Sequence, residues 1–244
     1  MPRILIDAHV HLHPGADPVA TLTAAHHRMA AMAGGEVMTL FMLAEQQGHD
    51  MFDALRPFAE ATDEAESLWL RHDGADLLVL AGRQVISAER LEVLALATAA
   101  HFEDGPSARD LVSAMLAQDA LVILPWGIGK WLGRRGDLVD RLMRDDGEGR
   151  LLLGDIGSRP VFWPVSRFGA RLVLRGSDPL PVVGDDRRIG TYGTILEGDV
   201  SRNRPARDIR ALIRQAEEGE AAAFGRLASP LAFLSGQLRL RLAS

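Results

Sequence analysis

The amino-terminal stretch DAHVHLHP places Asp7, His9 and His11 at every second position, directly after an apolar run. Side chains two residues apart on a strand point to the same side, so these three are expected to share a face where the strand ends. Two imidazoles in this arrangement can bind one ion at about 2.0–2.1 Å, and Asp7 could orient one of them. The spacing favours a metal site over its alternative, a polar strand end whose histidines bond to backbone or water.

Asp178 is a second candidate ligand, and it lies far along the chain, just beyond the apolar run in RLVLRGSDPLP. Sites in barrels and open α/β sheets form at the carboxyl ends of strands, so Asp178 is expected to converge with His9 and His11. The triplet SDP at 177–179 is also typical of a turn in which the Asp caps a backbone amide. The expected convergence favours the ligand role.

Three further polar residues follow predicted strands, and each has a structural alternative. Glu45 could complete the metal site, or it could mark the surface entry to a loop. His101 could face the same opening, although a loop histidine is more often solvated. Asp155 could act as a ligand or general base, or it could bind Arg159. We treat Glu45 as a candidate ligand, and His101 and Asp155 as candidate catalytic groups that move protons.

The stretch PWGIGKWLGRRG follows another predicted strand and contains Lys130, the only lysine of the chain. Glycines let backbone amides approach an anion, and an ammonium group is a point charge for phosphate or carboxylate. The stretch does not match a phosphate-binding P-loop, and Trp126 and Trp131 could simply cover the rim of the fold. We predict that Lys130 contacts an anionic group of the substrate.

The composition limits the class of protein. With 244 residues, 47% of them hydrophobic, the chain is long enough for one large α/β domain over 1–244. It has no cysteine, so any metal must rely on nitrogen and oxygen ligands. No apolar stretch reaches the roughly 18–20 residues of a membrane span and no signal peptide opens the chain, so we expect a soluble, cytoplasmic protein. The net charge of −6 indicates that nucleic acid is an unlikely partner.

Apolar runs alternate with helical patterns along the chain. Strands are expected at 3–9, 37–44, 67–72, 76–86, 91–98, 120–125, 150–156 and 171–175, and helices at 18–33, about 50–62, 107–118, 137–145 and about 205–218. Strands that are apolar throughout imply a parallel sheet covered on both faces, and about seven principal strands predict an α/β fold with a distorted (β/α)7 barrel. We expect a long loop at 184–204 and a helical tail over 205–244 packed on the barrel.

Three stretches resemble motifs of the PHP family of metal-dependent phosphoesterases and, more distantly, of amidohydrolases. DAHVHLHP resembles the first PHP motif, GSDPLP the last, and AGRQVISAERLEVLALAT the segment that contains Gly-x-Glu in the family. The resemblance spans about residues 4–190. It implies a seven-stranded distorted barrel, a cluster of up to three metal ions and hydrolysis of phosphoesters.

The chain also departs from the family pattern. Leu43-Ala44-Glu45 replaces an Asp-His pair, Gln84 replaces the bridging Glu, Leu180 replaces the last His, and no histidine follows His101. The resemblance therefore implies a reduced site of His9, His11 and Asp178, with Glu45, His101 or Asp155 in support. Such a site would hold one or two divalent ions (zinc, manganese or iron), or none, because Gln and Leu bring no negative charge.

Two functions follow from these residues. The first is a PHP-like metal-dependent hydrolase of a small phosphoester or another anionic substrate, in which the ion lowers the pKa of bound water. The second is an inactive PHP-like barrel that binds a ligand or a protein partner, which the replacements at Gln84 and Leu180 favour. Nucleic-acid processing is the least favoured by the acidic composition, and the oligomeric state is left open.

Overall fold

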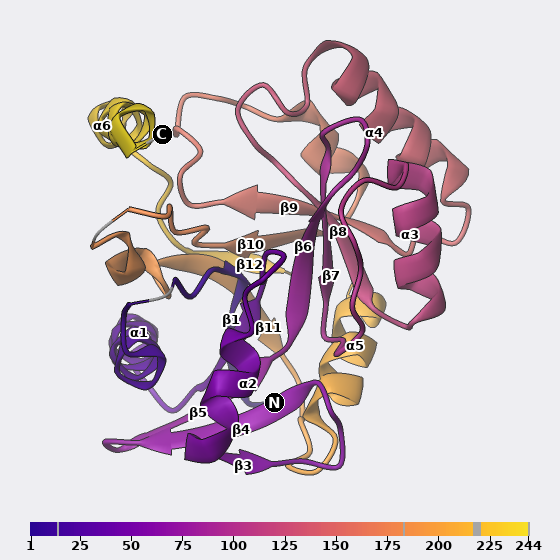
Figure 1. Cartoon of the computed structure of the whole chain (residues 1–244). Helices are drawn as coiled ribbons and strands as arrows, with labels where there is room; N and C mark the ends of the chain where they lie inside the picture. The colour runs from indigo at the N-terminus through magenta and orange to yellow at the C-terminus, as the bar shows by residue number, and fades with distance from the viewer. Residues whose placement is uncertain (14, 183, 217–220, 244) are drawn as a thin grey trace.

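The computed structural model describes residues 1–13, 15–182, 184–216 and 221–243, which form two β-sheets with helices around them (Figure 1). The first sheet has seven strands in the order β12-β11-β1-β2-β5-β4-β3: β1 (Arg3–Val10), β2 (Met38–Leu43), β3 (Ala59–Ala61), β4 (Ser67–His72), β5 (Ala75–Leu80), β11 (Tyr192–Glu197) and β12 (Ala222–Gly225). The second has five strands in the order β10-β9-β8-β7-β6: β6 (Gly82–Ile86), β7 (Glu92–Leu96), β8 (Leu121–Pro125), β9 (Leu151–Ile156) and β10 (Val173–Gly176).

The helices in the described part of the chain lie between and after these strands. They are α1 (Pro18–Ala33), α2 (Met51–Leu55), α3 (Ala108–Ala117), α4 (Gly133–Asp145), α5 (Pro205–Gln215) and α6 (Pro230–Ala243), with short 3-10 helices at Arg56–Phe58, Ser166–Ala170 and Asp185–Arg188. Most of the predicted elements are confirmed to within a few residues. Within the described residues, no helix combines the length and the apolar character needed to cross a membrane.

The predicted distorted (β/α)7 barrel is wrong, because the described strands form two separate sheets and no closed barrel. Both sheets are mixed. β1 pairs parallel with β2 but antiparallel with β11, and β8 pairs parallel with β9 but antiparallel with β7. An apolar run shows that a strand is covered on both faces, but it does not show the direction in which the neighbouring strand runs.

Three local predictions also differ from the structure. The segment 184–204 is not one long loop, because it supplies β11 beside β1. The helix predicted near 50–62 ends at Leu55, and a short 3-10 turn containing Pro57 follows it. The strand predicted over 76–86 is two strands in different sheets, with the chain passing from one to the other at Ala81 and Gly82. A Cβ atom at Gly82 would lie 2.5 Å from the Leu43 carbonyl oxygen, so this close crossing needs glycine.

The hydrophobic core has one layer between the sheets and one on the outer face of each. Between the sheets, side chains of β1, β2 and β5 pack against those of β7, β8 and β9, and α5 packs on the same cluster. The outer face of the first sheet is covered by α1 and that of the second by α3 and α4, as Figure 1 shows. This packing holds β1 and β10 in the interior of the molecule, where their carboxyl ends meet.

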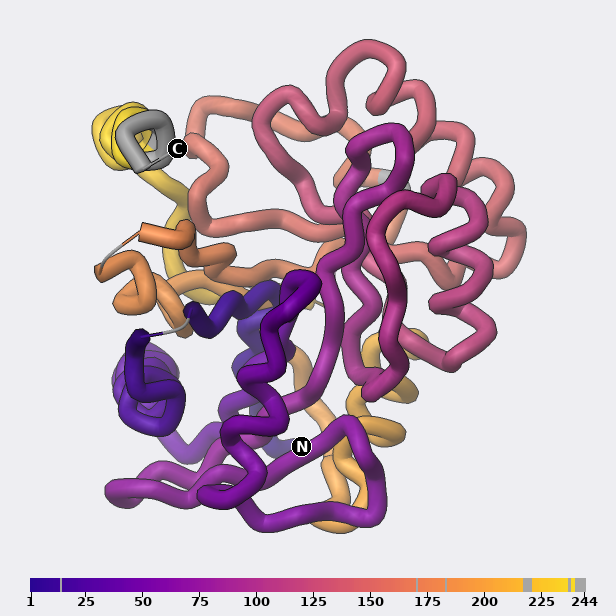
Figure 2. Tube along the Cα trace, in the orientation of Figure 1, coloured from indigo at the N-terminus to yellow at the C-terminus, as the bar shows by residue number. Residues whose placement is uncertain are grey.

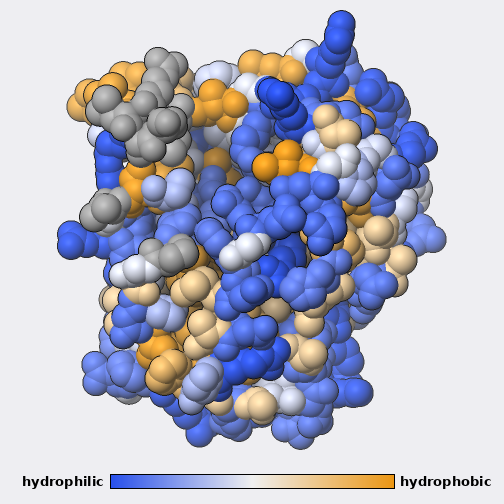
Figure 3. All heavy atoms as spheres, in the orientation of Figure 1, coloured by the Kyte–Doolittle hydropathy of each residue, from blue (hydrophilic) through white to orange (hydrophobic). Residues whose placement is uncertain are grey.

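The tail contacts the body only in part. α6 lies beside the loop after β10, where Arg239 Nη1 is 3.4 Å from the Asp185 carboxylate. Leu231, Leu234 and Leu238 on α6 remain exposed, and hydrophobic side chains gather at the upper left of Figure 3, where α6 lies. The predicted barrel beneath this tail is absent, and the packing of the whole tail on the body stays a prediction, since part of the apolar surface of α6 faces outward.

Candidate metal centre

An irregularity in β1 decides which way the histidines face. Ile4, Ile6 and Ala8 belong to the core between the sheets, whereas Val10 belongs to the core on the α1 side. The register with β2 shifts between Asp7 and Val10, so the alternation of side chains reverses there. His9 and His11 flank Val10 and therefore face the space between the sheets.

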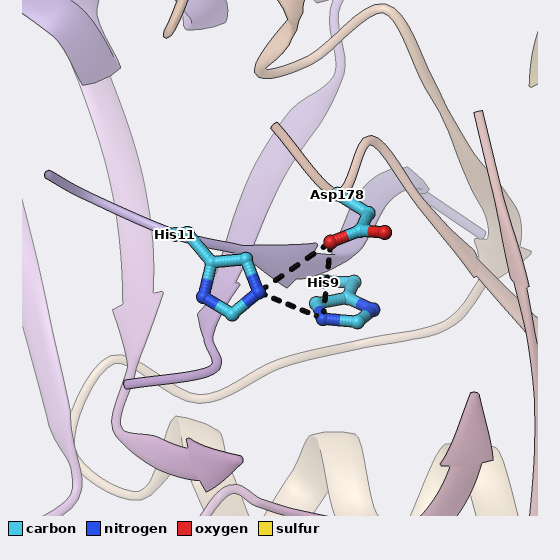
Figure 4. A group of neighbouring side chains, drawn as sticks. All are labelled: His9, His11 and Asp178. Atoms are coloured by element: carbon cyan, nitrogen blue, oxygen red, sulfur yellow. Dashed lines mark hydrogen bonds and ion pairs between the residues drawn. The ribbon is translucent and has the colours of Figure 1, made fainter. Parts of the chain in front are cut away.

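His9, His11 and Asp178 come together, as their positions at strand ends predicted. The two histidine Nε2 atoms are 3.0 Å apart, and each lies 3.5 Å from Asp178 Oδ1. Figure 4 shows the His11 imidazole and the Asp178 carboxylate directed at one point beside His9. Both histidines are buried, while Asp178 is partly exposed.

The chemistry and spacing of these three groups suit a metal ion. Imidazole nitrogen and carboxylate oxygen are ligands for zinc, manganese and iron. Ligands about 2.1 Å from an ion in a tetrahedral arrangement lie about 3.4 Å apart, close to the separations found here. Burial lowers the pKa of His9, which favours the neutral ring that a metal needs. Burial alone would raise the pKa of Asp178, but its interactions with His9, His11 and Lys130 hold that pKa below its usual range.

Asp178 is positioned by the backbone of β1. Its N–H donates to the His9 carbonyl oxygen at 2.9 Å, and its φ of +46° is a left-handed conformation that Asp tolerates better than most residues. Two residues earlier, Gly176 lies against His9, where a Cβ atom would be 2.3 Å from the His9 nitrogen. Glycine is therefore required for β10 to approach β1 closely enough to bring Asp178 to the histidines.

Asp7 has a different task from the one its spacing predicted. It is fully buried, and its carboxylate accepts hydrogen bonds of 2.8 Å from the backbone N–H groups of Ser177 and Gly190. Burial raises its pKa to about 6, although these hydrogen bonds act in the opposite direction. Because the irregularity of β1 lies between Asp7 and Val10, Asp7 does not share the face of the histidines. It instead fastens the segment that carries Asp178 to β1.

A methyl group at Gly176 tests this close approach. We expect Gly176→Ala to lower the free energy of unfolding by about 1–3 kcal/mol, because the added carbon overlaps the His9 backbone. We also expect weaker metal binding, since relief of the overlap moves Asp178 away from His9. Gly35→Ala is the matched control, because nothing lies within 4 Å of the added carbon there. Chemical denaturation and metal titration check both effects. Unchanged metal affinity in a destabilised Gly176→Ala would contradict the positioning role.

Two more polar groups lie near the cluster on the second sheet: Gln84, which sequence reasoning treated only as the replacement of a family ligand, and Glu92, to which it gave no role. Gln84 Oε1, on β6, lies 3.1 Å from His9 Nε2. Glu92, on β7, forms an ion pair with Lys130. Glu92 was the single charged residue in a strand of otherwise apolar residues, which was the available signal for it.

The other predicted site residues lie outside this group. Glu45 accepts a hydrogen bond from the Phe52 N–H at 2.9 Å and lies 3.5 Å from Arg83, so it anchors the start of α2. His101 is exposed in the loop after β7. The metal-ligand role of Glu45 and the catalytic role of His101 stay predictions, and the described geometry brings neither residue to the three ligands.

Asp155 lies in a buried network of its own. Its carboxylate receives two hydrogen bonds from Arg159, of 2.6 and 2.7 Å, and one of 2.7 Å from the Tyr192 hydroxyl. Burial and the charge of Asp155 raise the pKa of Tyr192. With both oxygens engaged, Asp155 is arranged to hold the loop after β9, and its catalytic role stays a prediction.

A cavity of about 590 Å³ begins at His11. Its wall includes His13 and His49 together with apolar side chains, among them Leu12, Met51 and Ile189. Burial lowers the pKa of His13, whose ring stacks on that of His11 with centroids 6.0 Å apart. Sequence reasoning gave His13 and His49 no role. The tube in Figure 2 shows the indigo amino-terminal segment close to the orange segment that follows β10, and both segments contribute residues to this cavity.

Comparison with known proteins identifies the fold. No family model and no curated protein matches the chain. PsfC from Pseudomonas syringae PB-5123 superposes with a TM-score of 0.60 at 16% identity, over 99% of this chain and 100% of PsfC. Endonuclease Q, in complex with a 27-mer duplex substrate with an abasic lesion at the active site, superposes with a TM-score of 0.56 at 14% identity, over 88% of this chain. The lesion-specific endonuclease PfuEndoQ from Pyrococcus furiosus has a TM-score of 0.56 at 12% identity, over 90% of this chain.

The chain spans 57% of the length of both endonucleases, and at these identities the likeness shows a shared fold. It also overturns one expectation. Nucleic acid is not excluded as a partner, because a protein with this fold holds a duplex at its active site. The net charge was a poor guide because it averages over the whole surface, whereas binding depends on the local field and shape at the site.

Proposed function

We propose that the protein is a metal-dependent hydrolase of phosphoester bonds and that its substrate class is nucleic acid. The observation that carries the proposal is the meeting of His9, His11 and Asp178, which lie far apart in the sequence, beside a cavity. Groups so far apart in sequence meet because of specific backbone contacts, such as the hydrogen bond from Asp178 N–H to the His9 carbonyl. An arrangement of this kind suits a binding site for an ion better than a solvated strand end.

The residues divide the chemical work between them. A divalent ion at this site would lower the pKa of bound water and polarise a phosphoryl oxygen. His9, His11 and Asp178 would hold it, leaving the side that faces the cavity for water and substrate. Lys130 lies close enough for its charge to act on Asp178, and its ammonium group would contact a non-bridging phosphate oxygen. The cavity at His11 would receive the part of the substrate attached to the phosphate.

Nucleic acid is proposed for two reasons. Proteins with this fold include endonucleases, one of them with a duplex substrate at its active site. The cavity also combines apolar side chains with the imidazoles of His13 and His49, which suits a planar polar group such as a nucleobase.

Metal content is the first test. Protein purified without chelator is expected to contain bound zinc, manganese or iron, measured by elemental analysis, and His9→Ala is expected to lose it. His27→Ala is the control, because His27 is exposed on α1 and outside the cluster. A native protein that binds none of these ions would refute the proposal and favour a binding module without catalysis.

Hydrolysis is the second test. We expect manganese-loaded protein to cleave bis-(p-nitrophenyl) phosphate and a duplex oligonucleotide with an abasic site, and a chelator to abolish both activities. Cleavage of the duplex should fall steeply as salt increases, because phosphate contacts release counterions. Metal-loaded protein that hydrolyses the small diester but neither duplex nor single-stranded oligonucleotides would refute nucleic acid as the substrate class.

A further inference from the structure

We propose that this site is built for one divalent ion, with the Gln84 amide oxygen as its fourth protein ligand and the Lys130–Glu92 ion pair in place of a second ion. The inference rests on the proposed function, because it concerns the same site. It adds a ligand and a metal stoichiometry, neither of which the three-residue cluster contains.

The first step is the position of Gln84. Its Oε1 lies 3.1 Å from His9 Nε2, in the range that separates the other three ligand atoms from one another. The side chain is buried and comes from β6, in the opposite sheet from His9. Gln84 pairs with Leu94 of the inner core, which places its side chain in the space between the sheets. Gln84 would therefore approach a bound ion from the second sheet, whereas His9 would hold it from the first.

The second step is charge. An amide oxygen can coordinate a hard or borderline cation, but it brings no negative charge. With two neutral imidazoles and one amide, Asp178 is the single carboxylate among the four ligands. One divalent ion would leave the group with a net positive charge, which attracts a phosphate. A second divalent ion at the same four ligands would have no further carboxylate to balance it.

The third step is the ion pair beside the ligands. Glu92 pairs with Ile86 across β6 and β7, two positions from the pairing of Gln84, so both side chains lie on the same face of the sheet. The charge of the Glu92 carboxylate is felt at His9, where it raises the pKa against the larger effect of burial. The same carboxylate forms an ion pair with the Lys130 ammonium. The carboxylate that could attract another ion is therefore already neutralised, and the ammonium repels a dication.

Metal stoichiometry tests the inference directly, without any activity assay. Equilibrium dialysis against Mn²⁺ followed by elemental analysis should give one ion per wild-type chain. Gln84→Glu should bind that ion about tenfold more tightly or better, since about 1.4 kcal/mol of added attraction gives a factor of ten. Gln84→Leu, which keeps the size but removes the oxygen, should bind about tenfold more weakly by the same conversion. The double variant Gln84→Glu/Lys130→Met, with two free carboxylates, should bind two ions.

The control is Gln118→Glu, which makes the same change of charge at an exposed position after α3. It should leave both affinity and stoichiometry unchanged, and thermal melts should establish that every variant is folded. A wild-type chain that binds two ions, both lost in His11→Ala, would overturn this inference while leaving the proposed hydrolase intact. So would a Gln84→Leu that binds as tightly as wild type, or a double variant that still binds one ion. Wild-type protein that binds no ion would instead refute the proposed function itself.

Discussion

Replacement of His11 by alanine is expected to abolish stoichiometric metal binding and to lower kcat/KM for phosphodiester hydrolysis by about 100-fold or more. Loss of a residue that merely supports a metal ligand lowers metal affinity or activity by about 10–100-fold. His11 is placed as a ligand itself, so the effect should be at least as large. Its Nε2 lies 3.0 Å from His9 Nε2 and 3.5 Å from Asp178 Oδ1, so the substitution removes one of the three clustered ligand atoms.

The same substitution should have little effect on folding. His11 lies beside the cavity, where water can enter the space that the ring leaves. Elemental analysis should therefore show that the ion is lost, whereas a thermal melt should show a melting temperature close to that of the wild type. His27→Ala, at an exposed position, should keep both. If His11→Ala retained one tightly bound ion, the ligand assignment would be wrong.

Loss of Asp7 should produce the largest loss of stability. We expect Asp7→Ala to lower the free energy of unfolding by about 2–6 kcal/mol, because each buried N–H left without an acceptor costs about 1–3 kcal/mol. Two such groups lose their partner, those of Ser177 and Gly190. Asp7→Asn keeps one oxygen acceptor, so its loss of stability should be about half as large.

Metal binding should weaken as well, although Asp7 does not touch the ligands. Asp178 directly follows Ser177, so freeing the Ser177 N–H loosens the segment that presents the carboxylate. We expect affinity for Mn²⁺ to fall about tenfold in Asp7→Asn, the lower end of the effect of removing support behind a ligand. Chemical denaturation and metal titration measure the two effects on one sample.

A control with comparable instability separates positioning from general loosening. Leu142 is buried between α4 and the second sheet, far from the ligands in the fold, and Leu142→Ala should cost about 2–5 kcal/mol. It should leave metal affinity unchanged. Equal loss of affinity in Leu142→Ala and Asp7→Asn would show that Asp7 has no specific role in positioning Asp178.

Much of the local structure was predictable from the sequence because it depends on neighbouring residues. The apolar run at 3–9 and the alanine-rich stretch at 18–33 identify β1 and α1, and Gly34 ends that helix in a left-handed conformation. The identity of His9, His11 and Asp178 as candidates also followed locally, since residue type and strand-end position are visible in sequence. Their convergence at one point is found in the structure.

Only the tertiary structure shows the features that depend on contacts between distant parts of the backbone, namely the direction of strand pairing and the face on which each polar side chain lies. The direction of strand pairing, and with it the two open sheets, follows from long-range hydrogen bonds that a run of apolar letters does not encode. One extra residue in β1 reverses the alternation of its side chains. Asp7 therefore lies on the opposite face from the histidines and accepts hydrogen bonds from the backbone N–H groups of Ser177 and Gly190. The residue types in the sequence thus determined which groups could bind a metal. The position of each group in the site depends on how β1, β6 and β10 approach one another. That approach depends on packing across the whole molecule, which only the tertiary structure shows.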